Sequence, residues 1–178
     1  MSVFENRAGD KNPQAYTNAI LDVLGDRDPF EVLRETPGVL EAEVAAVSPD
    51  RLGMPEKPGK WSIRQVVQHL ADSELMGGVR FRLVLAHDRP VIVAYDQDLW
   101  AGRLHYETSD TALALGDFRR IREANLRLLE SASEADLARA GVHAERGEES
   151  VAHMIRLYAG HDLVHLRQIR RIRAAIGA

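Results

Sequence analysis

Cysteine is absent from the 178-residue sequence, so the chain forms no disulfide and supplies no thiol of its own. No apolar run approaches the roughly 20 residues that a membrane-spanning helix requires. Residues Met1 to Asp10 also lack the apolar segment of a secretory signal. We therefore expect a cytoplasmic protein without a membrane partner.

An excess of positive charge is also missing, because 23 lysines and arginines face 27 acidic residues and give a net charge of −4. Nucleic-acid-binding domains carry a marked basic surface, so we expect no nucleic-acid partner. Hydrophobic residues at 45% and charged residues at 28% are ordinary for a globular protein. The length favours a single domain over residues 1–178, in which residues 1–11 are polar and loosely held.

Capping residues and apolar spacing predict a series of helices. Asn12-Pro13 and Asp28-Pro29 place a capping side chain before a proline, while Ser62 and Ser150 precede long stretches with helical periodicity. The predicted helices cover residues 13–24, 29–47, 62–86, 110–131 and 150–176, with a short turn over 133–139. Thr36-Pro37 is expected to break or kink the second helix.

The segment 87–105 is too long for a simple turn between two helices. It contains Val91-Ile92-Val93, a short apolar run without an evident partner strand, so we expect extended chain and then one helical turn around Trp100. Residues 140–147 are expected to form a polar loop. The predicted fold class is all-α, a four-helix bundle with short extra helices and a long connection after the helix that contains His69.

Three histidines fall on predicted inward faces. His161 and His165 are four residues apart, which places them one helical turn apart in the apolar stripe of the last helix. His69 lies on the inward face of the helix that starts at Ser62. Buried imidazoles need partners, and three of them suffice to hold a divalent metal with positions left for water or substrate. The alternative is three core histidines that serve no ligand.

The remaining histidines are weaker ligand candidates. His153 lies off the core stripe and two turns from His161, so a single ion cannot easily join the two. His87, His105 and His143 are expected in loops or at helix ends, in contact with solvent.

Several short motifs resemble a known family. They are Lys60-Trp61-Ser62, His69-Leu70-Ala71-Asp72-Ser73-Glu74, Arg80-Phe81-Arg82-Leu83, Tyr95-Asp96, Trp100-Ala101 and His161-x-x-x-His165 followed by Gln168-Ile169. Together they resemble the DinB-like superfamily of metal-binding four-helix bundles, and in particular its YfiT branch, described as metal-dependent hydrolases and bacillithiol transferases. The resemblance implies one ion on His69, His161 and His165, and a homodimer. It departs from the family at Val164, where a further histidine is frequent.

The leading hypothesis is a metal-dependent thiol S-transferase for a small-molecule substrate. Zinc or nickel would bind a low-molecular-weight thiol such as bacillithiol and lower its pKa before transfer to an electrophile. One alternative is a metal-dependent hydrolase that uses metal-bound hydroxide. Another is a non-enzymatic, metal-binding stress-response protein.

Five other residues receive expected roles at or near the site. Arg80 would bind a carboxylate of the cofactor, or else pair with a nearby acidic residue or stay solvated. Asp72 and Gln168 each follow a ligand by three residues and would orient it, unless they are ordinary surface residues. Trp100 and Tyr158 would line the pocket, or else belong to the core or a lid.

Overall fold

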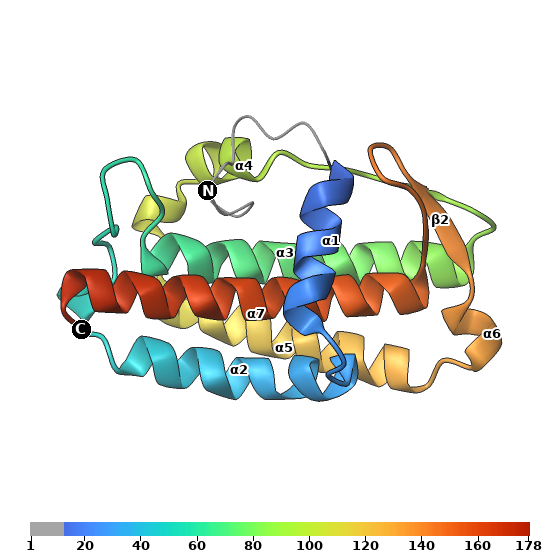
Figure 1. The fold of residues 1–178 in the computed structure, drawn as a ribbon, viewed down its shortest axis with the longest axis horizontal. Helices are drawn as coiled ribbons and strands as arrows, with labels where there is room; N and C mark the ends of the chain where they lie inside the picture. Colours follow the sequence, from blue (N-terminus) through green and yellow to red (C-terminus); the bar gives the residue numbers. More distant parts are fainter. Residues whose placement is uncertain (1–12) are drawn as a thin grey trace.

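The computed structural model describes residues 13–178, in which four long helices pack side by side (Figure 1). They are α2 (Pro29–Ala45), α3 (Ile63–Ala86), α5 (Thr111–Glu130) and α7 (Val151–Ile176). Helix α1 (Pro13–Leu24) crosses α7, and the shorter elements α4 (Gln97–Arg103), α6 (Glu134–Leu137), η1 (Pro49–Arg51) and η2 (Tyr106–Thr108) lie in the connections. The predicted four-helix bundle is confirmed. The predicted loose stretch 1–11 and the cap at Asn12 lie outside the described residues.

The helix boundaries follow the predicted caps closely. Ser62 and Gln65 form a reciprocal capping box at the start of α3, and the Ser150 hydroxyl accepts a hydrogen bond from the His153 amide at the start of α7. Gly177 ends α7 with a φ of 72°, a left-handed conformation that glycine adopts without steric cost. The two helices that carry the histidines are therefore fixed in register by local chemistry.

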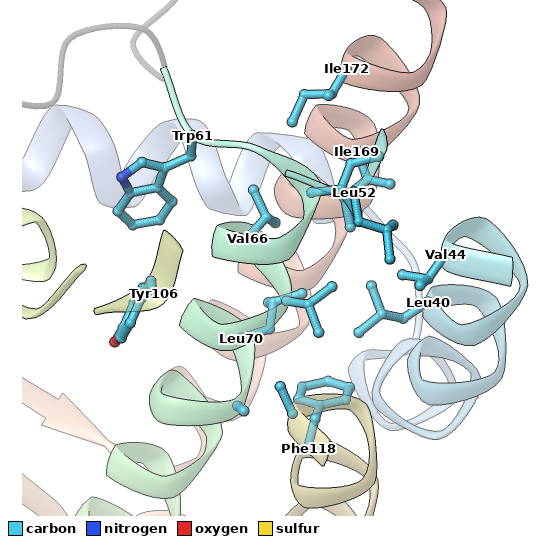
Figure 2. Close-up of a cluster of buried hydrophobic side chains, with 14 of the residues drawn as sticks. Leu40, Val44, Leu52, Trp61, Val66, Leu70, Tyr106, Phe118, Ile169 and Ile172 are labelled. Carbon is cyan, nitrogen blue, oxygen red and sulfur yellow. The ribbon is translucent and has the colours of Figure 1, made fainter. Parts of the chain in front are cut away.

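The core consists of two main apolar clusters at different levels along the bundle. Figure 2 shows the first cluster, in which Leu40, Leu70, Phe118 and Ile169 bring together α2, α3, α5 and α7. The second joins the same helices further along, at residues such as Phe81. Burying each such side chain stabilises the fold by about 1.5–3 kcal/mol.

A buried polar layer separates the two clusters. Each long helix contributes at least one member, and the layer consists of Thr36, Glu74, Arg122, Asn125 and Asp162. The apolar face of every long helix is thus interrupted near its middle. In the described part of the chain, no helix is both long and apolar enough to cross a membrane.

Helix α2 continues through Pro37, so of the break or kink predicted at Thr36-Pro37 the break is wrong. Proline has no amide hydrogen to donate to the carbonyl of residue 33, four positions earlier. That carbonyl, on Leu33, instead accepts a hydrogen bond of 2.9 Å from Nη1 of Arg122 on α5. The Thr36 hydroxyl also donates to the Val32 carbonyl at 2.7 Å. The tertiary contact from Arg122 therefore satisfies the carbonyl that the proline leaves without a donor.

The bundle carries a small three-stranded sheet that the sequence analysis did not predict. Strand β1 (Val91–Ile92) pairs parallel to β2 (Ala140–His143), which forms an antiparallel hairpin with β3 (Gly147–Ser150). The predicted polar loop over 140–147 is therefore wrong. The hairpin sequence is mostly polar and lacks apolar alternation, and the partner of β1 lies far along the chain, so no local pattern revealed the pairing.

Candidate metal centre

The three predicted histidines converge between α3 and α7. The Nε2 atom of His161 lies 3.2 Å from Nε2 of His69 and 3.1 Å from Nε2 of His165. All three candidate ligand atoms lie within 4.8 Å of one another. His69 and His165 are buried, whereas His161 is half-buried. The turn-by-turn spacing on α7 and the inward face of α3 thus place three ring nitrogens around one point.

Gln168 fixes the orientation of one of these rings. Its side-chain oxygen Oε1 lies 2.8 Å from Nδ1 of His165. Because an amide oxygen only accepts, Nδ1 is the protonated nitrogen and Nε2 keeps its lone pair directed at the other two histidines. A hydrogen bond of this kind holds an imidazole in the tautomer and direction that metal binding requires.

The nitrogen separations fit a metal ion better than hydrogen bonds among the rings. Nε2 of His161 faces two other Nε2 atoms, and one ring nitrogen donates one hydrogen at most. Ligands at the usual zinc–nitrogen distance in a tetrahedral site lie about 3.3 Å apart, close to the two observed separations. Neutral imidazoles suit zinc, nickel, iron or copper. Three protein ligands leave positions open, as in catalytic rather than structural sites.

The triad lines a pocket of about 970 Å³. This volume lies near the upper end of ordinary small-molecule sites. Helix α1 forms part of its wall, and α1 approaches α7 closely at Gly160, where a Cβ atom would lie 2.5 Å from the Ile20 carbonyl oxygen. The glycine that precedes His161 therefore allows this wall to pack beside the site.

A second polar group lies along the same pocket. Arg80 of α3 donates hydrogen bonds to the Val93 carbonyl at 2.6 Å and to the Tyr158 hydroxyl at 3.3 Å. The ring centroid of Tyr95 lies 5.6 Å from the guanidinium carbon of Arg80. The Tyr95 hydroxyl interacts with Ser73. Burial raises the pKa of Tyr95 and of Tyr158, so both stay protonated at neutral pH.

The structure separates the five other predicted residues into two groups. Arg80, Tyr158 and Gln168 line the pocket. Asp72 is not among the lining residues described, and it accepts hydrogen bonds from Tyr106 at 2.5 Å and from Gln68 at 3.2 Å. Trp100 packs on the pocket residue Tyr95 with a ring-centroid distance of 4.4 Å, without itself lining the cavity in the described chain.

His143 is the lining residue that the sequence analysis placed wrongly. It was expected in a solvated loop, but it belongs to β2, is only 2% exposed and lines the pocket. Burial is the main cause that lowers its pKa, helped by the positive charge of Arg146. Arg146 itself forms a two-point ion pair with the buried Glu149. No sequence signal marked this hairpin as a pocket wall, because its position depends on pairing with β1.

An ionic cluster lies on the side of α7 next to the triad. Arg122 donates to Asp162 at 2.7 Å and to Glu74 at 2.8 Å, and Asn125 also donates to Glu74 at 2.8 Å. Burial opposes the charge of Arg122, yet Asp162 and Glu74 hold its pKa above the ordinary value. Burial raises the pKa of Asp162 despite Arg122. One cation is thus shared by two buried carboxylates, and the negative charge of Glu74 helps to raise the pKa of Asp162.

Known proteins resemble this chain over most of its length. Residues 33–169 match the family model of the DinB superfamily. A protein of Bacillus licheniformis named "Putative metal-dependent hydrolase" is 35% identical over 148 residues, which cover 82% of this chain and 83% of that protein. A Bacillus mycoides protein of the same description is 31% identical and covers 89% of this chain and 90% of its own length.

A solved structure supports the same relationship. YfiT of Bacillus subtilis, described as "a probable metal-dependent hydrolase with an unusual four-helix bundle topology", aligns with a TM-score of 0.79 at 27% identity. The alignment covers 84% of this chain and 86% of that structure. The family match, the shared bundle and the three converging histidines agree with the motifs seen in the sequence. The chain belongs to the DinB superfamily, in the branch that includes YfiT.

Proposed function

We propose that the protein is a metal-dependent enzyme whose single divalent ion is held by His69, His161 and His165. The observation that carries this proposal is the convergence of three Nε2 atoms, two pairs of them 3.1 and 3.2 Å apart, on a pocket of about 970 Å³. A site closed by protein ligands and without a pocket would instead suit a non-enzymatic metal-binding protein. Relatives described as metal-dependent hydrolases support the metal requirement.

The proposed reaction is the transfer of a thiol, of the bacillithiol type, to a small electrophilic substrate. Zinc or nickel bound at the triad would act as a Lewis acid that lowers the pKa of a thiol. The chain has no cysteine, so the nucleophilic sulfur must come from a cofactor or co-substrate. Gln168 holds His165 in the binding tautomer, and Arg80 and Tyr158 offer donors to the remainder of the bound molecules.

A hydrolase with water as the nucleophile is the second candidate function. It is favoured by the relatives, which are described as metal-dependent hydrolases. The two functions differ in one measurable requirement: a hydrolase turns over without added thiol. We expect consumption of an electrophile only when both thiol and metal are present.

The test uses the purified full chain, metal analysis and an assay of thiol consumption. We expect about one metal per native chain and thiol transfer that His161→Ala abolishes together with the metal. The matched control is His87→Ala, because His87 is exposed at the end of α3 and far from the pocket lining. Transfer by metal-free protein would refute the proposal, and turnover of esters or amides without thiol would favour the hydrolase.

The proposal also covers assembly and location. We propose a homodimer that acts in the cytoplasm, where low-molecular-weight thiols are kept reduced. Light scattering of the purified protein measures the oligomeric state, and a monomer at micromolar concentration would contradict the proposed homodimer. Cell fractionation measures the location.

A further inference from the structure

Arg80 differs in its partners from the buried Arg122 and the half-buried Arg146. The guanidinium of Arg122 pairs with Glu74 and Asp162, and that of Arg146 pairs with Glu149. Arg80 is 8% exposed, yet none of the ion pairs in residues 13–178 includes it. Its hydrogen-bond partners are the neutral Val93 carbonyl and Tyr158 hydroxyl, and its Nε atom is buried without a partner in the described chain. A buried charge without a counterion is costly.

His143 presents a second buried donor to the same pocket. Its Nδ1 atom accepts a hydrogen bond from the Glu145 amide at 3.1 Å, so the proton of the neutral ring lies on Nε2. That Nε2 atom is buried and has no partner among the described residues. The charge of Arg80 reaches His143 and helps to lower the pKa of its ring. The two side chains therefore line one pocket, and the charge of Arg80 acts on the His143 ring.

Three acidic residues at or beside the pocket have other partners. Glu149 is bound at two points by Arg146, with distances of 2.5 and 2.9 Å. Glu74 belongs to the ionic cluster, and the Asp96 carboxylate accepts from the first amides of α4. These three carboxylates are held by other donors, a fourth nearby acid, Glu145, is exposed, and none of them pairs with Arg80 in the described chain, so its positive charge stays available to a ligand in the pocket.

We propose that Arg80 and His143 form an anion subsite that binds a carboxylate of the substrate whose other end reaches the histidine triad. This proposal rests on the proposed function, because it names the class of molecule that occupies that same pocket. Arginine suits the planar carboxylate, and the Nε2 hydrogen of His143 adds a neutral donor.

The charge of the subsite selects a carboxylate over a phosphate. Arg80 supplies one positive charge, and neutral His143 supplies none. A carboxylate carries one negative charge and is neutralised by this pair, whereas a phosphate group carries between one and two negative charges near neutral pH. The surplus charge would stay uncompensated in a buried position. The proposed ligand is thus a small molecule that carries a carboxylate and, a few bonds from it, a group that binds the metal.

The test compares three probes that share a thiol and differ only in the other end. They are 3-mercaptopropionate, its neutral amide 3-mercaptopropanamide, and 2-mercaptoethylphosphonate. Their affinities for the metal-loaded protein are measured by calorimetry. We expect the native protein to prefer the carboxylate over the amide by roughly 10- to 100-fold, the range of a charge-assisted hydrogen bond in a buried site.

Variants show which residues cause the preference. Arg80→Gln should bring the carboxylate-to-amide ratio close to one, and His143→Phe should lower it partly, while the metal content of both stays that of the native protein. Arg82→Gln is the matched control on the same helix, since Arg82 bonds to Gly78 and Asn125 and does not line the pocket described. If Arg80→Gln does not fold, Arg80→Lys keeps the charge but loses the planar fork, and should reduce the ratio.

Three outcomes would overturn the proposal: an unchanged ratio in a folded, metal-loaded Arg80→Gln protein, an unchanged ratio in Arg80→Lys if only that variant folds, or tighter binding of the phosphonate than of the carboxylate. Failure of the thiol-transfer function is detected separately. If the cobalt-substituted protein shows no thiolate-to-metal absorption with any probe, that function fails. The subsite is then decided by the affinity of butyrate relative to butyramide, which needs no thiol and should fall in the same variants.

Discussion

The ionic cluster and the histidine triad occupy neighbouring positions on α7 but differ in the surroundings of their polar groups. Asp162 is 1% exposed and pairs with Arg122, whereas the adjacent His161 is half-buried and lines the pocket. The cluster contains charges of both signs, and Arg122 pairs with each of its two carboxylates. The triad brings three groups of one kind, whose ligand atoms all lie within 4.8 Å of one another. Polar groups in the middle of this bundle therefore divide into those that pair with one another across the helices and those that line the pocket.

The two regions also differ in what their loss should affect. Breaking the cluster leaves a buried charge unpaired and acts on folding, because no water replaces the lost partner. Breaking the triad removes a ligand site and acts on folding only through the energy of the bound ion. Four experiments separate these effects, beginning with the largest.

The largest effect is expected for Arg122→Met. The change leaves Glu74 and Asp162 buried without their shared cation and frees the Leu33 carbonyl, so the free energy of unfolding should fall by about 3–5 kcal/mol. Urea denaturation measures it. Arg34→Met removes a half-exposed ion pair with Glu130 and should cost about 1 kcal/mol or less. Equal losses in the two variants would contradict the structural role of the cluster.

Metal removal should have the next largest effect. At a free metal concentration 100 times the dissociation constant, a bound ion stabilises the folded state by about 2.7 kcal/mol, which a chelator removes. The melting temperature of the native protein and of Arg34→Met should therefore fall on chelation. His161→Ala should show no response to the chelator. A response that persists in this variant would place the ion elsewhere.

Loss of the Gln168 hydrogen bond should weaken the triad without destroying it. In Gln168→Leu the His165 ring loses the acceptor that fixes its tautomer, so metal affinity should drop roughly 10- to 100-fold. Competition with a coloured chelator measures this affinity. Gln68→Leu is the matched control, because Gln68 precedes His69 but bonds to Asp72. A similar drop in both variants would show that the lower affinity comes from a change in the helices and not from the lost hydrogen bond to the His165 ring.

The smallest expected effect is a pH dependence from His143. Burial lowers the pKa of this ring below its ordinary value of 6.5. As the pH falls below 6.5, this ring takes up a proton in the unfolded chain before it does so in the folded chain. The stability that is present above pH 6.5 is therefore lost as the pH falls toward and through the pKa of the folded state.

The measurement compares urea unfolding at neutral pH and at about pH 5.5. His143→Phe should lose part of the stability decrease seen in the native protein, whereas His87→Phe, at an exposed site, should keep it. The other histidines contribute equally to each variant and cancel in the comparison. An identical pH dependence in all three proteins would show that His143 is not buried in solution.

Local sequence patterns predicted the helices and the triad because their signals act within one or two turns. Ser62, Ser150 and Gly177 mark helix ends through bonds to neighbouring backbone groups. His161 and His165 share a face because of helical geometry alone. The motifs around His69 and His165 also indicated the family before any fold was known. The same helical periodicity placed His69 on the inward face of another helix.

Other features were decided only by the tertiary structure. Arg122 compensates for Pro37, joins Glu74 to Asp162 and so connects four helices, but its own helix gives no sign of these partners. His143 enters the pocket because β2 pairs with β1 from a distant part of the chain. The sequence by itself determined the helices, their caps and the histidine faces, since these depend on neighbours in the chain. Which buried charges form ion pairs, and which line the pocket, depended on how helices and strands remote in sequence pack together.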